Sequence, residues 1–322
     1  MSRPFRFGVQ SYAPASGAQF REQVRQAEAL GYSVFNLADH VLGPGPALKA
    51  MNHPVQTVAA VPAMAVAAEV STTIKIGCRV FCCDYRNPAI FVKELATLDF
   101  FSEGRLEIGL GAGWLQGEYE AIGVPFLPAG QRIDRLEETI ALMRASFAEG
   151  ELSVEGTHVR AVGFEAVPKP VQAHPPLMIG GGARRVLGVA GREADIVSIN
   201  FNNSAGKIGA EGVGSGTADG TAQKLAWVRD GAGDRYDDIE LEIAAYFTIV
   251  TDDAAKANAQ MAGMFGLEPE QFAEHPHALI GSLDAMCEKL EARRERYGIS
   301  YVTVGASVME AFSPVVARLS GT

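Results

Sequence analysis

The sequence has few cysteines and a deficit of positive charge. The four cysteines, at positions 78, 82, 83 and 287, show no C-x-x-C spacing, which argues against a structural zinc site and a thioredoxin-like motif. Lysine and arginine total 28 against 38 acidic residues, a net charge of −10, so we expect no binding to nucleic acid or to an anionic membrane surface. Adjacent Cys82 and Cys83 are interpreted as small buried residues at a strand end, with a redox-active pair as the alternative.

Long apolar segments are also missing. The first twelve residues have no apolar signal core, and the stretch Val55–Val70 is interrupted and too short to span a bilayer. We therefore expect a cytoplasmic protein without a membrane segment. The sequence also lacks H-E-x-x-H, G-x-S-x-G and P-loop motifs, which argues against a metalloprotease, a serine hydrolase and a P-loop nucleotide site. No metal site is predicted.

What the sequence does have is regular alternation of apolar runs and amphipathic segments. Eight runs are predicted as strands, namely Phe5–Gln10, Val34–Ala38, Ile74–Phe81, Arg105–Leu110, Leu177–Ile179, Asp195–Ile199, Ile239–Val250 and Tyr301–Val304. Helical spacing lies mostly between them, for example in Ser16–Leu30 and Pro88–Phe101. The pattern predicts an α/β fold, a (β/α)8 TIM barrel that forms one domain over residues 1–322.

Two long segments follow predicted strands and belong at the C-terminal mouth of such a barrel. Leu42–Pro54 is rich in glycine and proline, and Asn200–Gly220 in glycine, serine and asparagine. Both are predicted to be insertion loops, either lids over a site or surface excursions without a role.

Asp39 and His40 directly follow the second predicted strand, which places them at the same mouth. An imidazole there is suited to proton transfer near neutral pH. The alternative is a helix-capping Asp39 with a solvated His40.

A glycine-rich turn, Gly180, Gly181 and Gly182, followed by Arg184 and Arg185, separates a predicted strand from a helix. Glycine backbone amides, a helix N-terminus and arginines together favour a phosphate site, while a tight turn with two solvated arginines is the alternative. Trp114 follows a second glycine-rich strand end, Gly109–Gly113, and is either a wall of the pocket or part of the core.

These motifs, in this order, resemble the bacterial luciferase-like family. The resemblance rests on Ala27–Tyr32 with Asp39-His40, on Glu103–Trp114 with Glu118-Tyr119, and on Pro168–Gln172 with Ile179–Gly182. It covers nearly the whole chain and is greatest for the F420-dependent oxidoreductase branch.

The resemblance implies a barrel that holds coenzyme F420, or alternatively flavin mononucleotide (FMN), with its ring over the mouth. By motif, Asp39 and Cys82 contact the ring end of the cofactor, and His40 acts beside the reactive carbon. The phosphate region of the cofactor is held by Gly181, Gly182, Arg184 and Arg185, next to Gly180. A non-prolyl cis peptide behind the ring is expected at Arg79–Val80.

Two departures from the family pattern restrict the function. Trp114 stands where the sugar-phosphate dehydrogenases of the family carry a glutamate, which argues against glucose-6-phosphate oxidation. Cys82 stands in place of a threonine, so the polar contact made there is in question.

Three functions remain in competition. The first is hydride transfer between F420 and a small organic substrate, and the second is an FMN-dependent monooxygenase supplied with reduced flavin by a separate reductase. The third is a cofactor-binding protein without turnover. A homodimer is expected in each case.

Overall fold

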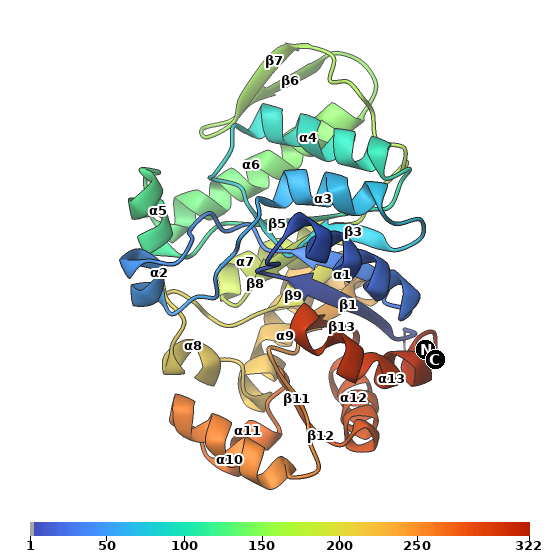
Figure 1. Ribbon diagram of the computed structural model, residues 1–322. Helices are drawn as coiled ribbons and strands as arrows, with labels where there is room; N and C mark the ends of the chain where they lie inside the picture. The colour runs from blue at the N-terminus through green and yellow to red at the C-terminus, as the bar shows by residue number, and fades with distance from the viewer. Residues whose placement is uncertain (1–2) are drawn as a thin grey trace.

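The computed structural model describes residues 3–322, and a closed barrel of parallel strands lies at its centre (Figure 1). The hydrogen-bonded order β3-β2-β1-β13-β10-β9-β8-β5 is closed by pairing of β3 with β5. The predicted (β/α)8 barrel is confirmed. The eight strands within the described residues are β1 (Arg6–Ser11), β2 (Val34–Leu37), β3 (Lys75–Cys78), β5 (Leu106–Gly111), β8 (Leu177–Gly181), β9 (Ile196–Ile199), β10 (Glu240–Ala244) and β13 (Ile299–Gly305).

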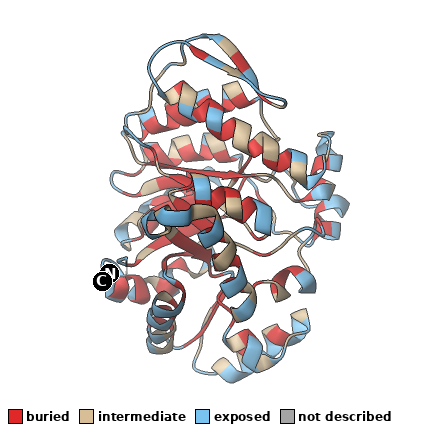
Figure 2. Cartoon of the chain, turned by 180° about the vertical axis from the view of Figure 1, so that it is seen from behind, coloured by how far each residue is buried: buried red, intermediate tan, exposed pale blue. Residues whose placement is uncertain are grey.

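Helices form the outer layer of the barrel and bury one face each against the strands (Figure 2). The helices of this layer are α1 (Gly17–Ala29), α3 (Ala60–Glu69), α4 (Pro88–Phe101), α6 (Ala129–Phe147), α7 (Arg184–Glu193), α9 (Ala218–Ala232), α12 (Leu283–Tyr297) and α13 (Met309–Leu319). Among residues 3–322 no helix has the length and apolarity needed to cross a membrane.

Local sequence signals explain where the predicted helices begin and end. The Ser16 side chain accepts a hydrogen bond from Gln19 N–H at the start of α1, and Gly31, with φ +81°, follows its end. Asn87 caps α4, and Pro88 occupies its first turn, where the missing N–H costs nothing. Both helices match their predicted ranges closely.

Two predicted strands are each divided in the structure. Ile74–Phe81 becomes β3 and the short β4 (Phe81–Cys82), which are separated by the cis peptide Arg79–Val80. Ile239–Val250 becomes β10 and β11 (Phe247–Val250), and β11 leaves the barrel to pair with β12 (Ala278–Gly281). A continuous apolar run carried no sign of this departure because β11 is also partly buried, against a second small core.

Further elements lie outside the barrel layers. An antiparallel pair, β6 (Leu152–Glu155) and β7 (Arg160–Phe164), packs over α6, and α10 (Ala254–Phe265) with α11 (Pro269–Ala273) covers β11 and β12 (Figure 1). The remaining short helices are α2 (Pro46–Met51), α5 (Gln116–Ile122), α8 (Ala210–Gly214), η1 (Gly233–Asp238) and η2 (Ala306–Val308). The two predicted insertion loops therefore contain helices α2 and α8.

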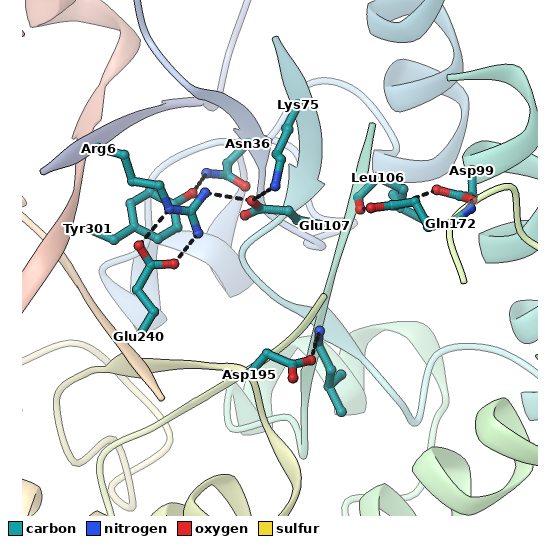
Figure 3. Close-up of polar contacts among 11 residues, drawn as sticks. Arg6, Asn36, Lys75, Asp99, Leu106, Glu107, Gln172, Asp195, Glu240 and Tyr301 are labelled. Atoms are coloured by element: carbon teal, nitrogen blue, oxygen red, sulfur yellow. Dashed lines mark hydrogen bonds and ion pairs between the residues drawn. The ribbon is translucent and has the colours of Figure 1, made fainter. Parts of the chain in front are cut away.

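A cluster of charged side chains closes the N-terminal end of the barrel. The Arg6 guanidinium lies between the carboxylates of Glu107 and Glu240, with N···O distances of 2.5 Å to each, and stacks on the Tyr301 ring (Figure 3). Lys75 adds a second cation 3.1 Å from Glu107. Ligands of the barrel must therefore enter at the opposite end.

The two ends of the described chain meet at this closed side. Phe5 N–H donates to the carbonyl of Thr322, and Gly321 N–H donates to the carbonyl of Phe5 (Figure 1). An isolated bridge between Phe5 and Ser320 extends the contact.

Candidate functional site

A cavity of about 530 Å³ opens at the C-terminal mouth of the barrel, within the size range of small-molecule sites. Its walls come from the segments that follow the barrel strands. They include Asp39, His40, Arg79, Val80, Cys82, Trp114, Gly180, Gly181 and Gly182, nine of the eleven residues predicted for the site.

Val80 projects into the mouth, directly after the predicted cis peptide, which is confirmed at Arg79–Val80. Glycines leave room for it on two neighbouring strands. A Cβ atom on Gly111 would lie 2.6 Å from a Val80 methyl group, and one on Gly180 would lie 3.2 Å from the other. Steric fit around Val80 is therefore one reason for the glycines at these strand ends.

His40 is held by a buried carboxylate that the sequence did not assign to it. His40 Nδ1 lies 2.7 Å from Oε2 of Glu118, whose side chain is fully buried in α5. Glu118 also accepts hydrogen bonds from the Tyr85 hydroxyl at 2.6 Å and from Val41 N–H at 2.7 Å. Burial by itself raises the pKa of Glu118, but these bonds and His40 outweigh it and hold that pKa below its usual value. His40 therefore forms a side-chain dyad with Glu118, in contrast to the solvated His40 of the alternative interpretation.

Asp39 lies at the same strand end but makes separate contacts. Its two oxygens accept a forked pair of hydrogen bonds from Arg86 at 2.6 and 2.7 Å, and one oxygen also accepts from Cys82 N–H at 3.0 Å. The side chain is buried and does not contact His40 through any hydrogen bond among residues 3–322. Its position at the cavity wall agrees with a contact to a bound ring, which stays a prediction.

The cysteines are free and buried. Cys82 Sγ lies 3.0 Å from the Tyr119 hydroxyl, which donates to Asp84. Burial raises the pKa of the Cys82 thiol to about 12, so the thiol stays protonated at neutral pH. This favours the interpretation of Cys82 and Cys83 as buried small residues over a redox pair.

A second histidine, His53, lies against His40 in the cavity wall. The ring centroids of His40 and His53 are 4.0 Å apart, and Trp114 lies 6.2 and 5.9 Å from them. His53 Nδ1 lies 2.8 Å from the carbonyl of Pro54. Burial and the neighbouring His40 lower the pKa of His53 to about 4. Trp114 therefore lines the cavity, in agreement with the interpretation of Trp114 as a pocket wall and not with its placement in the core.

Arg79 crosses beneath the mouth to the opposite side of the barrel. Its Nε donates to Glu242 at 2.9 Å, and its Nη1 donates to the Tyr246 hydroxyl at 3.1 Å and to Gln10 at 3.3 Å. Arg79 Nη2 is buried and has no hydrogen-bond partner within residues 3–322. It is therefore a free donor for a bound molecule or water.

Arg184 and Arg185 do not line the cavity, in contrast to the predicted phosphate site. Arg185 points away to α6, where it pairs with Asp134 and donates to the carbonyl of Gly130 at 2.9 Å. The glycine turn has a packing reason of its own, because a Cβ on Gly182 would lie 2.0 Å from the carbonyl oxygen of Phe201. The ion pair with α6 explains why Arg185 is unavailable to the mouth.

Arg132, in the first turn of α6, occupies the corner where a cation was expected. It lines the cavity beside Ala129, and its guanidinium donates to the carbonyls of Leu127 and Gly113. The N-termini of α6 and α7 meet here through the Arg185 contact with Gly130. Helix N-termini favour anions, so this corner combines a cationic side chain with two positive helix ends.

The segment Asn200–Gly220 is tied down by a buried cation. Lys224 Nζ donates to the carbonyls of Asn200 and Ser215 at 2.7 and 2.8 Å. The segment covers one side of the cavity through Asn200–Ser204 and Ile208. Its opening as a lid stays a prediction.

The family model described as luciferase-like monooxygenase matches residues 1–301. The chain belongs to this luciferase-like family. A curated relative, the FMNH2-dependent dimethylsulfone monooxygenase of Pseudomonas putida, is 35% identical over 121 residues, 37% of this chain and 33% of that protein. The F420-dependent glucose-6-phosphate dehydrogenase of Segniliparus rotundus is 33% identical over 129 residues, 39% of this chain and 38% of that protein. The part of this luciferase-like chain that matches thus spans about a third of the length of the first relative and 38% of the second.

A solved structure with the same fold is the coenzyme F420-dependent tetrahydromethanopterin reductase of Methanopyrus kandleri. It superposes with a TM-score of 0.74 and 18% identity over 98% of both chains, which supports the luciferase-like fold. The relatives therefore include both F420-dependent and FMNH2-dependent enzymes.

Three side chains at or beside the cavity of the luciferase-like barrel were not predicted from the sequence, namely Glu118, His53 and Arg132. Glu118 appeared only as part of a family motif, and its partner His40 is 78 residues away. Its place on α5, directly after the glycine-rich strand end, was the one signal that pointed to the mouth. His53 lies in the predicted insertion loop Leu42–Pro54, and that loop was its one signal. Arg132 gave no local signal, because only the fold brings α6 to the cavity.

Proposed function

We propose that this luciferase-like protein is an oxidoreductase that transfers a hydride between coenzyme F420 and a small organic substrate. The observation that carries the proposal is the His40–Glu118 dyad, whose imidazole lines the mouth cavity while the carboxylate lies buried behind it. Hydride transfer to or from an organic substrate is accompanied by a proton, and an imidazole backed by a carboxylate is suited to exchange it. When bound, F420 supplies the ring carbon that accepts or donates the hydride.

The residues around the cavity fit a flat, anionic cofactor of the flavin type. Val80 and the glycine-rich strand ends form an apolar wall of low relief, against which a ring can lie. Asp39 and the backbone of Cys82 stand at one end of this wall. At the floor of the cavity, the buried Nη2 donor of Arg79 has no hydrogen-bond partner within the described residues.

The cofactor phosphate is assigned to the corner made by Arg132 and the N-termini of α6 and α7. Gly181 and Gly182 line the same side of the cavity, so the predicted glycine contacts are retained. The role predicted for Arg184 and Arg185 is proposed for Arg132 instead, since neither arginine lines the cavity and Arg185 is engaged with Asp134. Charge-assisted hydrogen bonds from Arg132 would hold the phosphate oxygens.

His40 then serves as the proton-transfer residue, exchanging the substrate proton at Nε2 while Nδ1 stays on Glu118. Trp114 and His53 enclose the substrate side of His40 and limit water there. Limiting water strengthens the electrostatic contacts made by the dyad.

The second candidate is an FMN-dependent monooxygenase, favoured by the match to the dimethylsulfone monooxygenase of Pseudomonas putida. It would require reduced flavin from a separate reductase. The third candidate, cofactor binding without turnover, gives no role to the His40–Glu118 dyad. Homodimer formation stays a prediction.

Equilibrium titration of the purified protein with F420 and with FMN, followed by visible absorbance, tests the proposal. F420 is expected to bind more tightly than FMN. Micromolar binding of FMN without detectable binding of F420 would overturn the F420 assignment and favour the monooxygenase.

A further inference from the structure

Two imidazoles, His40 and His53, share one wall of the cavity, yet their surroundings differ. Their ring planes are tilted by 51° at a centroid distance of 4.0 Å. In each ring Nδ1 is bonded to the protein, and Nε2 has no hydrogen-bond partner among residues 3–322. The two outer nitrogens are therefore the atoms that a ligand can reach.

The partner of Nδ1 fixes the tautomer of each neutral ring. The carbonyl of Pro54 can only accept a hydrogen bond, so His53 Nδ1 carries the hydrogen. Glu118 is an acceptor as well, since Val41 N–H and the Tyr85 hydroxyl already donate to its two oxygens. His40 Nδ1 must then donate to Glu118, which leaves Nε2 with its lone pair toward the cavity.

The partners also decide which ring can hold a positive charge. The carboxylate in contact with His40 is that of the fully buried Glu118. Tyr85 hydrogen-bonds to Glu118 and is connected to His40 only by way of that carboxylate. The hydrogen-bond partner of His53 is the neutral carbonyl of Pro54. Burial, and then the neighbouring His40, lower the pKa of His53 to about 4, and the hydrogen bond to Pro54 offsets this only in part. Trp114 adds an uncharged ring that lies near both imidazoles. Protonation of both adjacent imidazoles is unfavourable because two positive charges at this distance repel each other.

We propose that Glu118 is a positioning residue that fixes His40 in the Nδ1–H tautomer and makes His40, not His53, the imidazole that exchanges a proton at Nε2. A proton taken up at Nε2 of His40 gives an imidazolium whose Nδ1–H remains on Glu118, and its release restores the same tautomer. The inference deepens the proposed function, because it names the group that prepares His40 for proton transfer.

Nitrogen-15 NMR of the cofactor-free protein with labelled histidine, recorded from pH 8 to pH 5, tests this directly. Long-range proton–nitrogen correlations distinguish the two neutral tautomers and the imidazolium, and His40→Ala and His53→Ala spectra assign the signals. In the parent protein both rings are expected as Nδ1–H tautomers. His53 is expected to stay largely neutral down to pH 5.

Glu118→Gln is the decisive variant. Val41 N–H requires an oxygen at the Oε1 position, so the amide group of the new side chain faces His40 and donates to Nδ1. His40 is then expected to switch to the Nε2–H tautomer. Glu120→Gln, an exposed change on the same helix, is the matched control and is expected to leave both rings unchanged.

An Nε2–H tautomer of His40 in the parent protein would overturn the inference, and so would a Glu118→Gln spectrum identical to the parent spectrum. Full protonation of His53 above pH 5 would overturn it too. If Glu118→Gln does not fold, the parent spectrum still decides. No cofactor is present in this experiment, so its outcome is separate from that of the F420 titration.

Discussion

Arg185 and Asp134 form an ion pair that ties the start of α7 to the start of α6. The pair holds two helix N-termini together at one corner of the cavity while it turns Arg185 away from the cavity itself. Arg132 is left as the cation of that corner. Two arginines close together in the fold therefore have different tasks, one structural and one available to a ligand.

Replacement of each arginine by glutamine should separate the two roles. Arg132→Gln is expected to weaken F420 binding roughly ten- to a hundredfold, because a charge-assisted hydrogen bond contributes about 1.5–3 kcal/mol. Arg185→Gln is expected to change the dissociation constant little and to lower thermal stability slightly. Titration of both variants with F420 measures this, and a loss of affinity confined to Arg185→Gln would return the phosphate site to the glycine turn.

Removal of the imidazole of His40 should affect turnover far more than binding. His40→Ala is expected to lower turnover by roughly 10²–10⁴, the usual contribution of general acid–base catalysis, with cofactor affinity nearly unchanged. The assay follows F420 absorbance with a substrate found by screening small alcohols and carbonyl compounds. His174→Ala, at an exposed histidine far along the chain, serves as the control. Parent-level turnover by His40→Ala would remove His40 from the mechanism.

Close backbone approach at the glycine turn should make Gly182 intolerant of any side chain. A methyl group there would lie 2.0 Å from the carbonyl oxygen of Phe201, so Gly182→Ala is expected to destabilise the protein by about 1–3 kcal/mol or more. Gly214→Ala, where nothing lies within 4 Å of the added carbon, is the matched control. Urea unfolding of both variants measures the difference. Equal midpoints would mean that the turn relaxes freely.

Buried histidines near Phe201 should make the fold sensitive to acid. Neutral His275 is satisfied on both sides, since Nε2–H donates to the carbonyl of Val213 and Nδ1 accepts from His277 N–H. Burial lowers the pKa of His275 to about 4. The unfolded chain, with an ordinary value near 6.5, therefore binds the proton first as the pH falls, and stability decreases between about pH 6.5 and 4.

His275→Gln removes this titration while its amide can still donate to Val213. Its free energy of unfolding is expected to fall less between pH 7 and 4 than that of the parent, by on the order of 2–3 kcal/mol. His174→Gln, at an exposed position, should keep the parent pH dependence. Urea unfolding at several pH values gives the comparison, and parallel curves for His275→Gln and the parent would contradict the expectation.

Features with local causes were predictable from the sequence. The start of α4 depends on Asn87 and Pro88, which act within one turn, and the end of α1 depends on Gly31. The barrel followed from regular alternation along the chain. The cis peptide at Arg79–Val80 was predictable only through the family resemblance.

Features that depend on distant partners were not predictable. Arg185 is 51 residues from Asp134, and nothing near either residue indicates that they pair. The same holds for the buried carboxylate behind His40. The run Ile239–Val250 looked like one strand because burial in a second core gives β11 the same apolar composition as β10.

Because the two ends of the described chain meet beside Phe5, the fold does not depend on where along the sequence the chain is opened. Phe5 and Thr322 are already hydrogen-bonded neighbours at the closed end of the barrel, so a short peptide could join the termini. New ends could then be opened in an exposed turn such as that between β6 and β7. Tags or fusion partners that extend from the chain beside Phe5 or Thr322 would likewise start behind the barrel and leave the entrance to the cavity clear.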